Sequence, residues 1–140
     1  MRKFRLLARF WLPPLGWMGL IFFISSFPTG RASHIDWQDF AIKKTIHIFE
    51  YVVLFTLLYR GLKNLSSLPE KKAAFMAFLL TFLYAASDEF HQTFTQGREG
   101  TPRDVLIDSL GALLAWWGIW KYLPKAPAKL KNWAKKLQII

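Results

Sequence analysis

Ionisable and hydrogen-bonding side chains gather beside three strongly apolar segments of this 140-residue chain. His47 and Glu50 are three positions apart and Tyr51 follows His47 by four, so one face of a helix presents all three. Further along the chain come Asp88, Glu89, His91, Gln92, Arg98, Arg103, Asp104 and Asp108. Ionisable groups in or beside a bilayer are costly, so their presence there indicates a functional site.

These side chains divide into two groups by the chemistry open to them. Six residues are candidate catalytic groups because their side chains can accept or donate a proton: His47, Glu50, Asp88, Glu89, His91 and Asp108. All of these except Glu89 are also candidate ligands of a divalent metal ion, which would polarise a phosphate or activate water. The candidate substrate-binding residues are Tyr51, Gln92, Arg98, Arg103 and Asp104. The arginines among them suit an anionic head group.

Three functions fit such a cluster, and the sequence leaves the choice open. The first is enzymatic chemistry on a lipid of the cell envelope, by metal-assisted or general acid-base catalysis, with a Ser26 nucleophile and His47 as one variant. The second is a non-catalytic site that binds a lipid-linked wall precursor or a lipoglycopeptide. The third is a proton or ion relay. A relay needs polar residues along a whole pathway, whereas the inner halves of the second and third apolar segments are nearly bare.

Each of these residues also has a purely structural interpretation. Asp104 can cap a helix, and Arg98 and Glu99 can form a solvated pair. Pairs of Glu50 with Lys43 or Arg98, and of Asp88 with Arg103, can fix helix register. For a single residue this interpretation is as good as the functional one. Packing alone, however, rarely requires so many acids and histidines at one depth in a membrane.

Four apolar segments must position these residues, at about 10–27, 42–60, 73–92 and 104–123. Each approaches the roughly 20 apolar residues that a helix needs to cross the hydrocarbon core of a bilayer. The chain is 53% hydrophobic, with 13 Phe and 7 Trp, which is more apolar surface than so short a soluble domain would bury. We therefore expect an all-α, polytopic membrane protein with four transmembrane helices. Pro13 and Pro14 argue against a cleaved signal peptide in the first segment.

Basic residues lie in three blocks that alternate with the apolar segments. Fourteen of the nineteen Lys and Arg residues fall within residues 2–9, 60–72 and 121–136, whereas eight of the nine acidic residues fall elsewhere. By the positive-inside rule, we expect a multi-pass protein of the cytoplasmic membrane with both termini and the 60–72 loop inside. The chain has a net charge of +10. Because the basic blocks alternate with apolar segments, this charge indicates interaction with a membrane and not with nucleic acid. The chain has no Cys, which excludes thiol chemistry.

The chain divides into a transmembrane domain, residues 1–123, and a basic tail, residues 124–140. Apolar residues recur in the tail at near-helical spacing among lysines: Leu130, Trp133, Leu137 and Ile140. We expect a basic amphipathic segment on the inner leaflet, held partly by anionic lipid, with a disordered tail as the alternative.

Local signals predict where helices begin and where they pack. The pair Pro13-Pro14 suits the first turn of the first helix, and Ser67 to Glu70 has the spacing of a capping box for the third. Thr101-Pro102 suits the N-cap and first position of the fourth helix. Small surfaces for close helix packing are offered in the fourth segment by Gly111, Ala115 and Gly118.

The polar residues also form an ordered series of motifs. The series is His47-x-x-Glu50-Tyr51, Asp88-Glu89-x-His91-Gln92, Gly97-Arg98, Asp104 and Gly111. In this order it resembles the VanZ-like family of small bacterial membrane proteins, from Ser25-Ser26 to about Trp117, most specifically between Asp88 and Arg98. The family pattern tends to Asn at the position of Asp108, so this chain would carry an extra carboxylate that alters the charge or metal preference of the site.

The resemblance implies an integral-membrane, multi-helix fold and an association with resistance to the glycopeptide teicoplanin. It brings no established mechanism, and resistance in one member need not be the task of another. The partners expected of the site are membrane lipids and a lipid-linked wall precursor or glycopeptide, with no nucleic acid. A divalent metal ion is the candidate cofactor.

Overall fold

A computed structural model describes residues 2–28, 34–96, 98 and 100–140. Five α-helices account for most of them: α1 (Arg2–Ser25), α2 (Asp36–Leu65), α3 (Glu70–Gln92), α4 (Pro102–Trp117) and α5 (Ala128–Lys136). A π-helix turn, Gly118–Tyr122, and a 3₁₀ turn, Leu123–Lys125, join α4 to α5. The described residues contain no strand, so the expected all-α class is confirmed.

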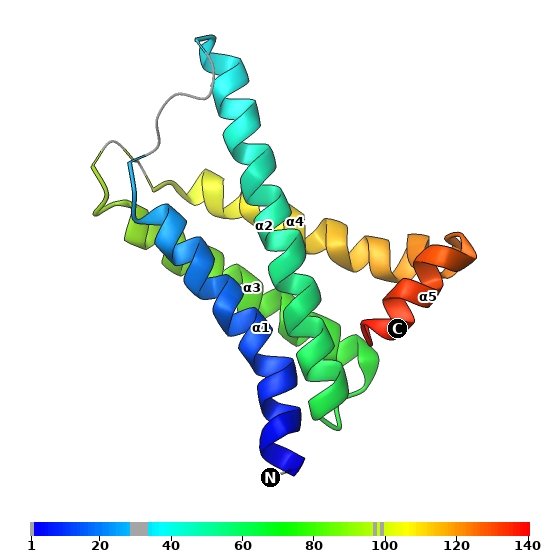
Figure 1. Ribbon diagram of the computed structural model, residues 1–140. Coiled ribbons are helices and arrows are strands. Elements are labelled where there is room, and N and C mark those ends of the chain that lie inside the picture. Colours follow the sequence, from blue (N-terminus) through cyan, green and yellow to red (C-terminus); the bar gives the residue numbers. More distant parts are fainter. Residues whose placement is uncertain (1, 29–33, 97, 99) are drawn as a thin grey trace.

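Helix α2 is the centre of the bundle. It packs against α1, α3 and α4, and α3 also packs against α4 (Figure 1). The last turns of α1 and α3 and the first turn of α4 lie at one end of the bundle (Figure 1). The N-terminus and the turn between α2 and α3 lie at the other end. The topology thus brings the candidate site residues of α3 and α4 to the same end.

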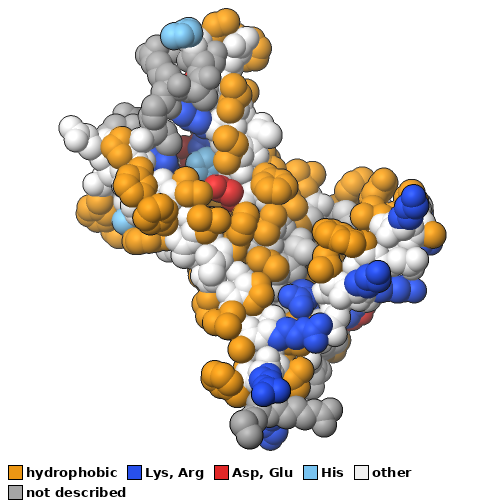
Figure 2. All heavy atoms as spheres, in the orientation of Figure 1, with side chains coloured by type: hydrophobic (Ala, Val, Ile, Leu, Met, Phe, Trp, Pro, Cys, Tyr) orange, Lys and Arg blue, Asp and Glu red, His pale blue; other side chains and the backbone are white. Residues whose placement is uncertain are grey.

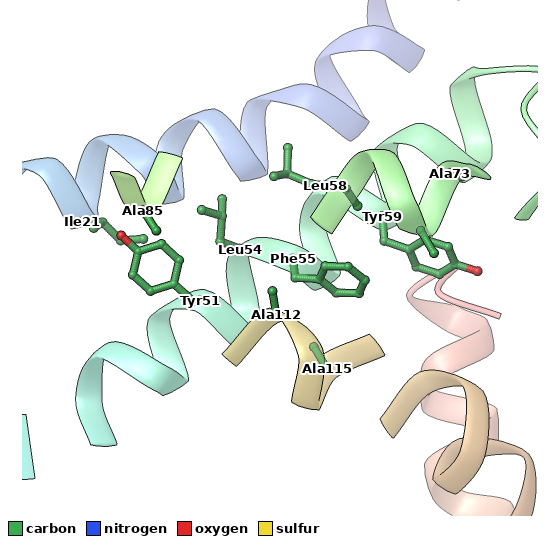
Figure 3. Close-up of a cluster of buried hydrophobic side chains, with 12 residues drawn as sticks. Ile21, Tyr51, Leu54, Phe55, Leu58, Tyr59, Ala73, Ala85, Ala112 and Ala115 are labelled. Atoms are coloured by element: carbon green, nitrogen blue, oxygen red, sulfur yellow. The ribbon is translucent and has the colours of Figure 1, made fainter. Parts of the chain in front are cut away.

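Large side chains of α2 fill the core against small side chains of its neighbours. The buried α2 residues recur at three- and four-residue spacings, as on one helix face: Tyr51, Leu54, Phe55, Leu58 and Tyr59. Facing them, α3 contributes Ala73, Ala74, Ala77 and Ala85, and α4 contributes Ala112 and Ala115 (Figure 3). Small residues on the facing helices let the backbones approach closely.

Gly111 marks a very close approach of α4 to α2. A side chain at this position would overlap the carbonyl oxygen of Ile48, and Ala115 one turn later is buried. The predicted packing role is therefore confirmed for these two residues. It is wrong for Gly118, where an added Cβ would meet no described atom within 4 Å, because Gly118 begins the π-helix turn and faces a groove beside α2.

Helix α1 begins earlier than predicted. It starts at Arg2 and runs through Pro13 and Pro14, so the prediction that this pair forms the first turn is wrong. Pro14 lacks the amide that would bond the carbonyl oxygen of Phe10. That oxygen faces α2 instead, 3.3 Å from a Cβ built on Gly61. The packing of α1 on α2 thus accommodates the prolines within the helix.

The predicted N-caps of α3 and α4 have opposite outcomes. Helix α3 has Pro69 as its N-cap and no side-chain cap, so the predicted capping role of Ser67 is wrong. A residue that precedes proline is disfavoured in the helical region, which moves the start of the helix past Leu68. For α4 the prediction is confirmed, because the Thr101 hydroxyl accepts a hydrogen bond of 3.2 Å from the backbone N–H of Asp104.

The tail folds back onto the end of α2. Helix α5 ends where Gln138 adopts a φ of 58° and the N–H of Ile139 donates to the carbonyl of Ala134, as at many helix C-termini. The carbonyl of Gln138 then accepts a hydrogen bond of 3.0 Å from the Asn64 side chain. Trp133 remains exposed among the lysines of α5. The predicted amphipathic helix is therefore present, and the structure also attaches its end to α2.

The outer surface of the bundle is largely apolar. Among the described helices, two are long and apolar enough to cross a membrane, at Lys3–Ser25 and Glu70–Gln92. Helix α4 also exposes large apolar side chains, namely Leu106, Leu110, Leu113, Leu114 and Trp117. Lys and Arg side chains gather near the N-terminus and over the C-terminal segment (Figure 2). Apolar surface of this extent is typical of a protein in contact with lipid or a partner.

Candidate functional site

The carboxylate of Asp88 joins three helices. Ser25 at the end of α1 and Gln92 one turn later on α3 each donate to Asp88 Oδ2 at 3.0 Å. The Tyr51 hydroxyl of α2 donates to the same oxygen at 3.4 Å. Asp88 is only 2% exposed, and its second oxygen, Oδ1, has no hydrogen-bond partner among the described residues. One oxygen therefore holds the helices together and the other is a buried acceptor.

One face of α2 carries the basic and acidic groups next to Asp88. His47 Nδ1 lies 3.3 Å from Glu50 Oε2, which is an ion pair when the imidazole is protonated. Lys44 Nζ lies 3.0 Å from Asp104 Oδ2 of α4. The indole of Trp17 donates to the backbone carbonyl of Glu50 at 2.9 Å, which fixes α1 against this face. The predicted face of α2 is thus formed, and it connects to both α1 and α4.

The start of α4 is held against Glu89 of α3. The backbone N–H of Thr101 donates to Glu89 Oε2 at 3.2 Å. This contact requires Gly100, because a side chain there would overlap the carbonyl oxygen of Glu89 and lie 2.8 Å from Thr93 Cγ2. The other carboxylate oxygen of Glu89 has no hydrogen-bond partner in the described part of the chain. One carboxylate oxygen of Glu89 therefore holds the start of α4, and the other can accept a hydrogen bond from a ligand.

Asp108 is the most enclosed of the acids. It is 0% exposed, and neither of its carboxylate oxygens has a hydrogen-bond partner among residues that the structure describes. The charged groups acting on it are Lys44, Glu89, Asp88 and Asp104. Burying a carboxyl group without a hydrogen bond costs free energy. We therefore expect a ligand or water to donate a hydrogen bond to Asp108.

The two arginines occupy different places. Arg98 acts electrostatically on His47, Glu50 and Asp88, and its guanidinium lies 3.4 Å from the carbonyl oxygen of Ile24. Arg103 is 68% exposed, and its Nε is 3.7 Å from Asp104 Oδ1. Its guanidinium lies 5.1 Å from the centre of the Phe40 ring. Arg98 thus belongs to the cluster, and Arg103 lies at its edge. Gly97, the other half of the Gly-Arg motif, is outside the described residues.

His91 lies on the α1 side of the cluster. Its ring is centred 4.2 Å from that of Phe22, and its Nε2 lies 3.1 Å from Ser26 Oγ. Ser26 therefore neighbours His91, and not the His47 that the sequence suggested as its partner. The Ser26 hydroxyl donates to the carbonyl of Phe22 at 2.7 Å, so in this arrangement His91 is the donor and Ser26 the acceptor.

We call the connected residues the polar cluster. Its acids are Glu50, Asp88, Glu89, Asp104 and Asp108; its cations are Lys44 and Arg98; and Ser25, His47, Tyr51, His91 and Gln92 complete it. Among the described His, Asp and Glu side chains, no group of three is arranged to hold a metal ion. Acidic and histidine side chains show between apolar surfaces beside the first half of α2 (Figure 2).

Sequence reasoning missed two members of the polar cluster. Lys44 precedes His47 by three residues and Tyr51 by seven, so the helical spacing that selected those two could also have selected Lys44. Ser25 donates to Asp88 across 63 positions of sequence. No local pattern links two such residues, and only the packing of α1 on α3 brings them together.

Comparison with known proteins identifies the chain at the level of a family. A search among curated proteins found no match, and neither did a search among solved structures. The family model described as VanZ/LLP1 matches residues 10–123, which include every candidate site residue. With two helices apolar enough to cross a membrane, this match indicates a membrane protein. The chain therefore belongs to the VanZ/LLP1 family.

Proposed function

We propose that α1, α2, α3 and α4 all cross the cytoplasmic membrane, with both termini inside and the polar cluster in the outer leaflet. The exposed leucines of α4 and the apolar outer faces of α1 and α3 support this arrangement. So do the Lys and Arg side chains that gather near the N-terminus and over the C-terminal segment (Figure 2).

At the polar cluster the protein binds the head group of an anionic cell-envelope lipid or lipid-linked wall precursor. The observation that carries this proposal concerns three enclosed carboxylates, those of Asp88, Glu89 and Asp108. Each has at least one oxygen without a hydrogen-bond partner among the described residues, and each lies within the electrostatic reach of Lys44 or Arg98. The cations suit a phosphate. The carboxylate oxygens suit hydroxyl or amide donors, which the sugar and peptide of a wall precursor supply.

Such binding explains an association with glycopeptide susceptibility. The family is associated with resistance to teicoplanin, and glycopeptides act on wall precursors at the outer face of the membrane. A protein that holds the precursor there reduces the access of the drug without modifying it. The function proposed for this chain is therefore lowered teicoplanin susceptibility through binding in the outer leaflet.

The experiment is a binding assay with the full chain in lipid nanodiscs. A polyprenyl-linked wall precursor is titrated in, and native mass spectrometry detects the complex. We expect a saturable complex of one precursor per chain and unchanged precursor after long incubation. The absence of any saturable complex under conditions where the helices remain folded would overturn the proposal.

Catalysis is the second candidate, and the contact between Ser26 and His91 favours it. As Ser26 Oγ attacked an ester carbon or phosphorus, His91 Nε2 would take its proton and later pass it to the leaving group. The hydroxyl must first turn from the carbonyl of Phe22 toward the imidazole. A new lipid product that disappears with Ser26→Ala would establish this reaction. A stable complex that Ser26→Ala leaves unchanged supports binding alone.

A further inference from the structure

An apolar groove lies between the last turns of α3 and the start of α4. Its volume is about 420 Å³, within the range of pockets that take small molecules. Its walls include Phe82, Ala86 and Phe90 from α3, with Val105 and Leu106 from α4. Phe90 and Leu106 are exposed on the outside of the bundle. The groove is therefore open toward the region that lipid chains occupy in the proposed arrangement.

One acidic side chain, Glu89, lines this apolar groove. Glu89 is 3% exposed, and one of its oxygens already accepts the N–H of Thr101. The other oxygen has no hydrogen-bond partner within the described residues. A buried carboxylate oxygen beside apolar walls is costly unless a donor reaches it. A ligand of the groove should therefore carry a hydrogen-bond donor next to an apolar chain.

Glu89 also connects the groove to the polar cluster. The charged groups acting on it are Lys44, Asp104 and Asp88, all of which belong to that cluster. An amphiphile can thus place its head among these charges and its chain in the groove, with Glu89 at the junction. A water-soluble head group would leave the groove empty and forgo the burial of apolar surface there.

We propose that this groove binds the hydrocarbon chain of the lipid whose head group occupies the polar cluster, with Glu89 Oε1 accepting a hydrogen bond from the first donor of that head. This inference rests on the proposed function and specifies its ligand as a chain-bearing lipid that enters from the membrane. Entry from the side, between α3 and α4, leaves the links among α1, α2 and α3 at Asp88 intact.

The test is photocrosslinking with a polyprenyl-linked precursor that carries a diazirine in its chain, using the full protein in nanodiscs. We expect crosslinks within residues 82–106, mapped by mass spectrometry, and little competition from the precursor head group without its chain. Crosslinks spread evenly over the outer faces of the helices, or full competition by the chainless head group, would overturn the inference.

Two tryptophan variants provide a matched comparison. Leu106→Trp fills the groove, whereas Leu113→Trp lies two helical turns further along the same face of α4, exposed and outside the groove. We expect Leu106→Trp to weaken binding by about tenfold or more, because it displaces roughly two methylene groups of the chain, and Leu113→Trp to leave it unchanged. Equal precursor binding by both variants would contradict the proposal that the groove holds the lipid chain.

The same assay separates failure of this inference from failure of the proposed function. If Asp88→Asn abolishes saturable binding while Leu106→Trp retains it, the head-group site stands and the groove inference fails. If the wild-type protein shows no saturable binding, both fail. Glu89→Gln keeps the size of the side chain and can still accept the N–H of Thr101, but it places a donor at the free position. We expect it to bind as weakly as Leu106→Trp.

Discussion

At the residue scale, Asp88 links the helices that form the polar cluster. One of its oxygens accepts hydrogen bonds from Ser25, Tyr51 and Gln92, which come from three different helices. Hydrogen bonds to a charged group contribute about 1.5–3 kcal/mol each. The carboxylate thus orients the side chains around it and leaves its second oxygen for a ligand.

Asp88→Asn tests this role with almost no change in side-chain size. The amide offers one acceptor and one donor where the carboxylate offered two acceptors, so either the links to Ser25 and Gln92 or the free acceptor must be lost. We expect precursor binding to fall at least about tenfold at unchanged abundance in the membrane. Lys135→Ala in the tail is the control and should bind as the wild type does. Equal loss in both variants would contradict a localised site.

Neighbouring lysines allow a sharper comparison on α2. Lys44 pairs with Asp104 inside the polar cluster, whereas Lys43 pairs with Asp39. We expect Lys44→Met to weaken precursor binding by about tenfold or more, because it removes a cation that would contact the phosphate, and losing one partner of a buried charge pair across an interface costs about 2 kcal/mol or more. Lys43→Met should change precursor binding little, because Lys43 pairs with Asp39 of the same helix, outside the polar cluster. Similar titration curves for the two variants would show that Lys44 has no special role.

At the scale of elements, the position of the polar cluster depends on how closely α2 can pack with its neighbours. Large side chains of α2 meet alanines on α3 and α4, and Gly111 allows the backbone of α4 to reach that of α2 near Ile48. Asp108 precedes Gly111 by three residues, on nearly the same side of α4. The close contact therefore also sets the depth at which Asp108 is buried.

Two glycines of the α4 region should respond differently to a methyl group. Gly111→Ala forces a Cβ into the backbone of α2, which cannot move aside cheaply, and we expect a loss of stability of about 1–3 kcal/mol. Gly118→Ala meets no described atom within 4 Å and should be neutral or slightly stabilising. Thermal unfolding of the two purified variants in the same detergent measures the difference. A lower melting temperature for Gly118→Ala than for the wild type would contradict the open space around this position.

The sequence was informative where long periodic patterns were involved. Apolar runs located the four long helices, and their alternating directions correctly brought Asp88 of α3 and Asp104 of α4 to one end. Local signals were less dependable. Pro13 and Pro14 resemble a helix start, but α1 continues through them, with the carbonyl oxygen of Phe10 packed near Gly61 of α2. The bond from Ser25 to Asp88 depends on tertiary packing, so no local pattern could reveal it.

At the scale of the whole molecule, charge is distributed along the bundle. The acids of the polar cluster lie near the end where the last turns of α1 and α3 meet the start of α4 (Figure 1). Basic side chains gather near the N-terminus and over the tail, which returns to Asn64 of α2 (Figure 2). A protein placed in a bilayer with its basic end inside would present the polar cluster to the outer leaflet. The proposed function requires this orientation, because wall precursors and glycopeptides meet outside the cell.

Orientation can be measured directly because the chain has no Cys. Single cysteines at His34→Cys and Ser67→Cys place a thiol in each of two connections on opposite sides of the proposed membrane, both at exposed positions. We expect a membrane-impermeant maleimide to label position 34 in intact cells and position 67 only after permeabilisation. Labelling of position 67 in intact cells would contradict the proposed orientation.

The central claim is that the polar cluster is a working site in the outer leaflet. Its most direct test is teicoplanin susceptibility of a Gram-positive host that expresses the wild type, Asp88→Asn, His91→Ala or Lys135→Ala at matched membrane levels. We expect the wild type and Lys135→Ala to protect the host, and Asp88→Asn and His91→Ala to lose that protection. Equal protection by all four proteins would show that the cluster is structural, and no protection by the wild type would contradict the proposed role in glycopeptide susceptibility.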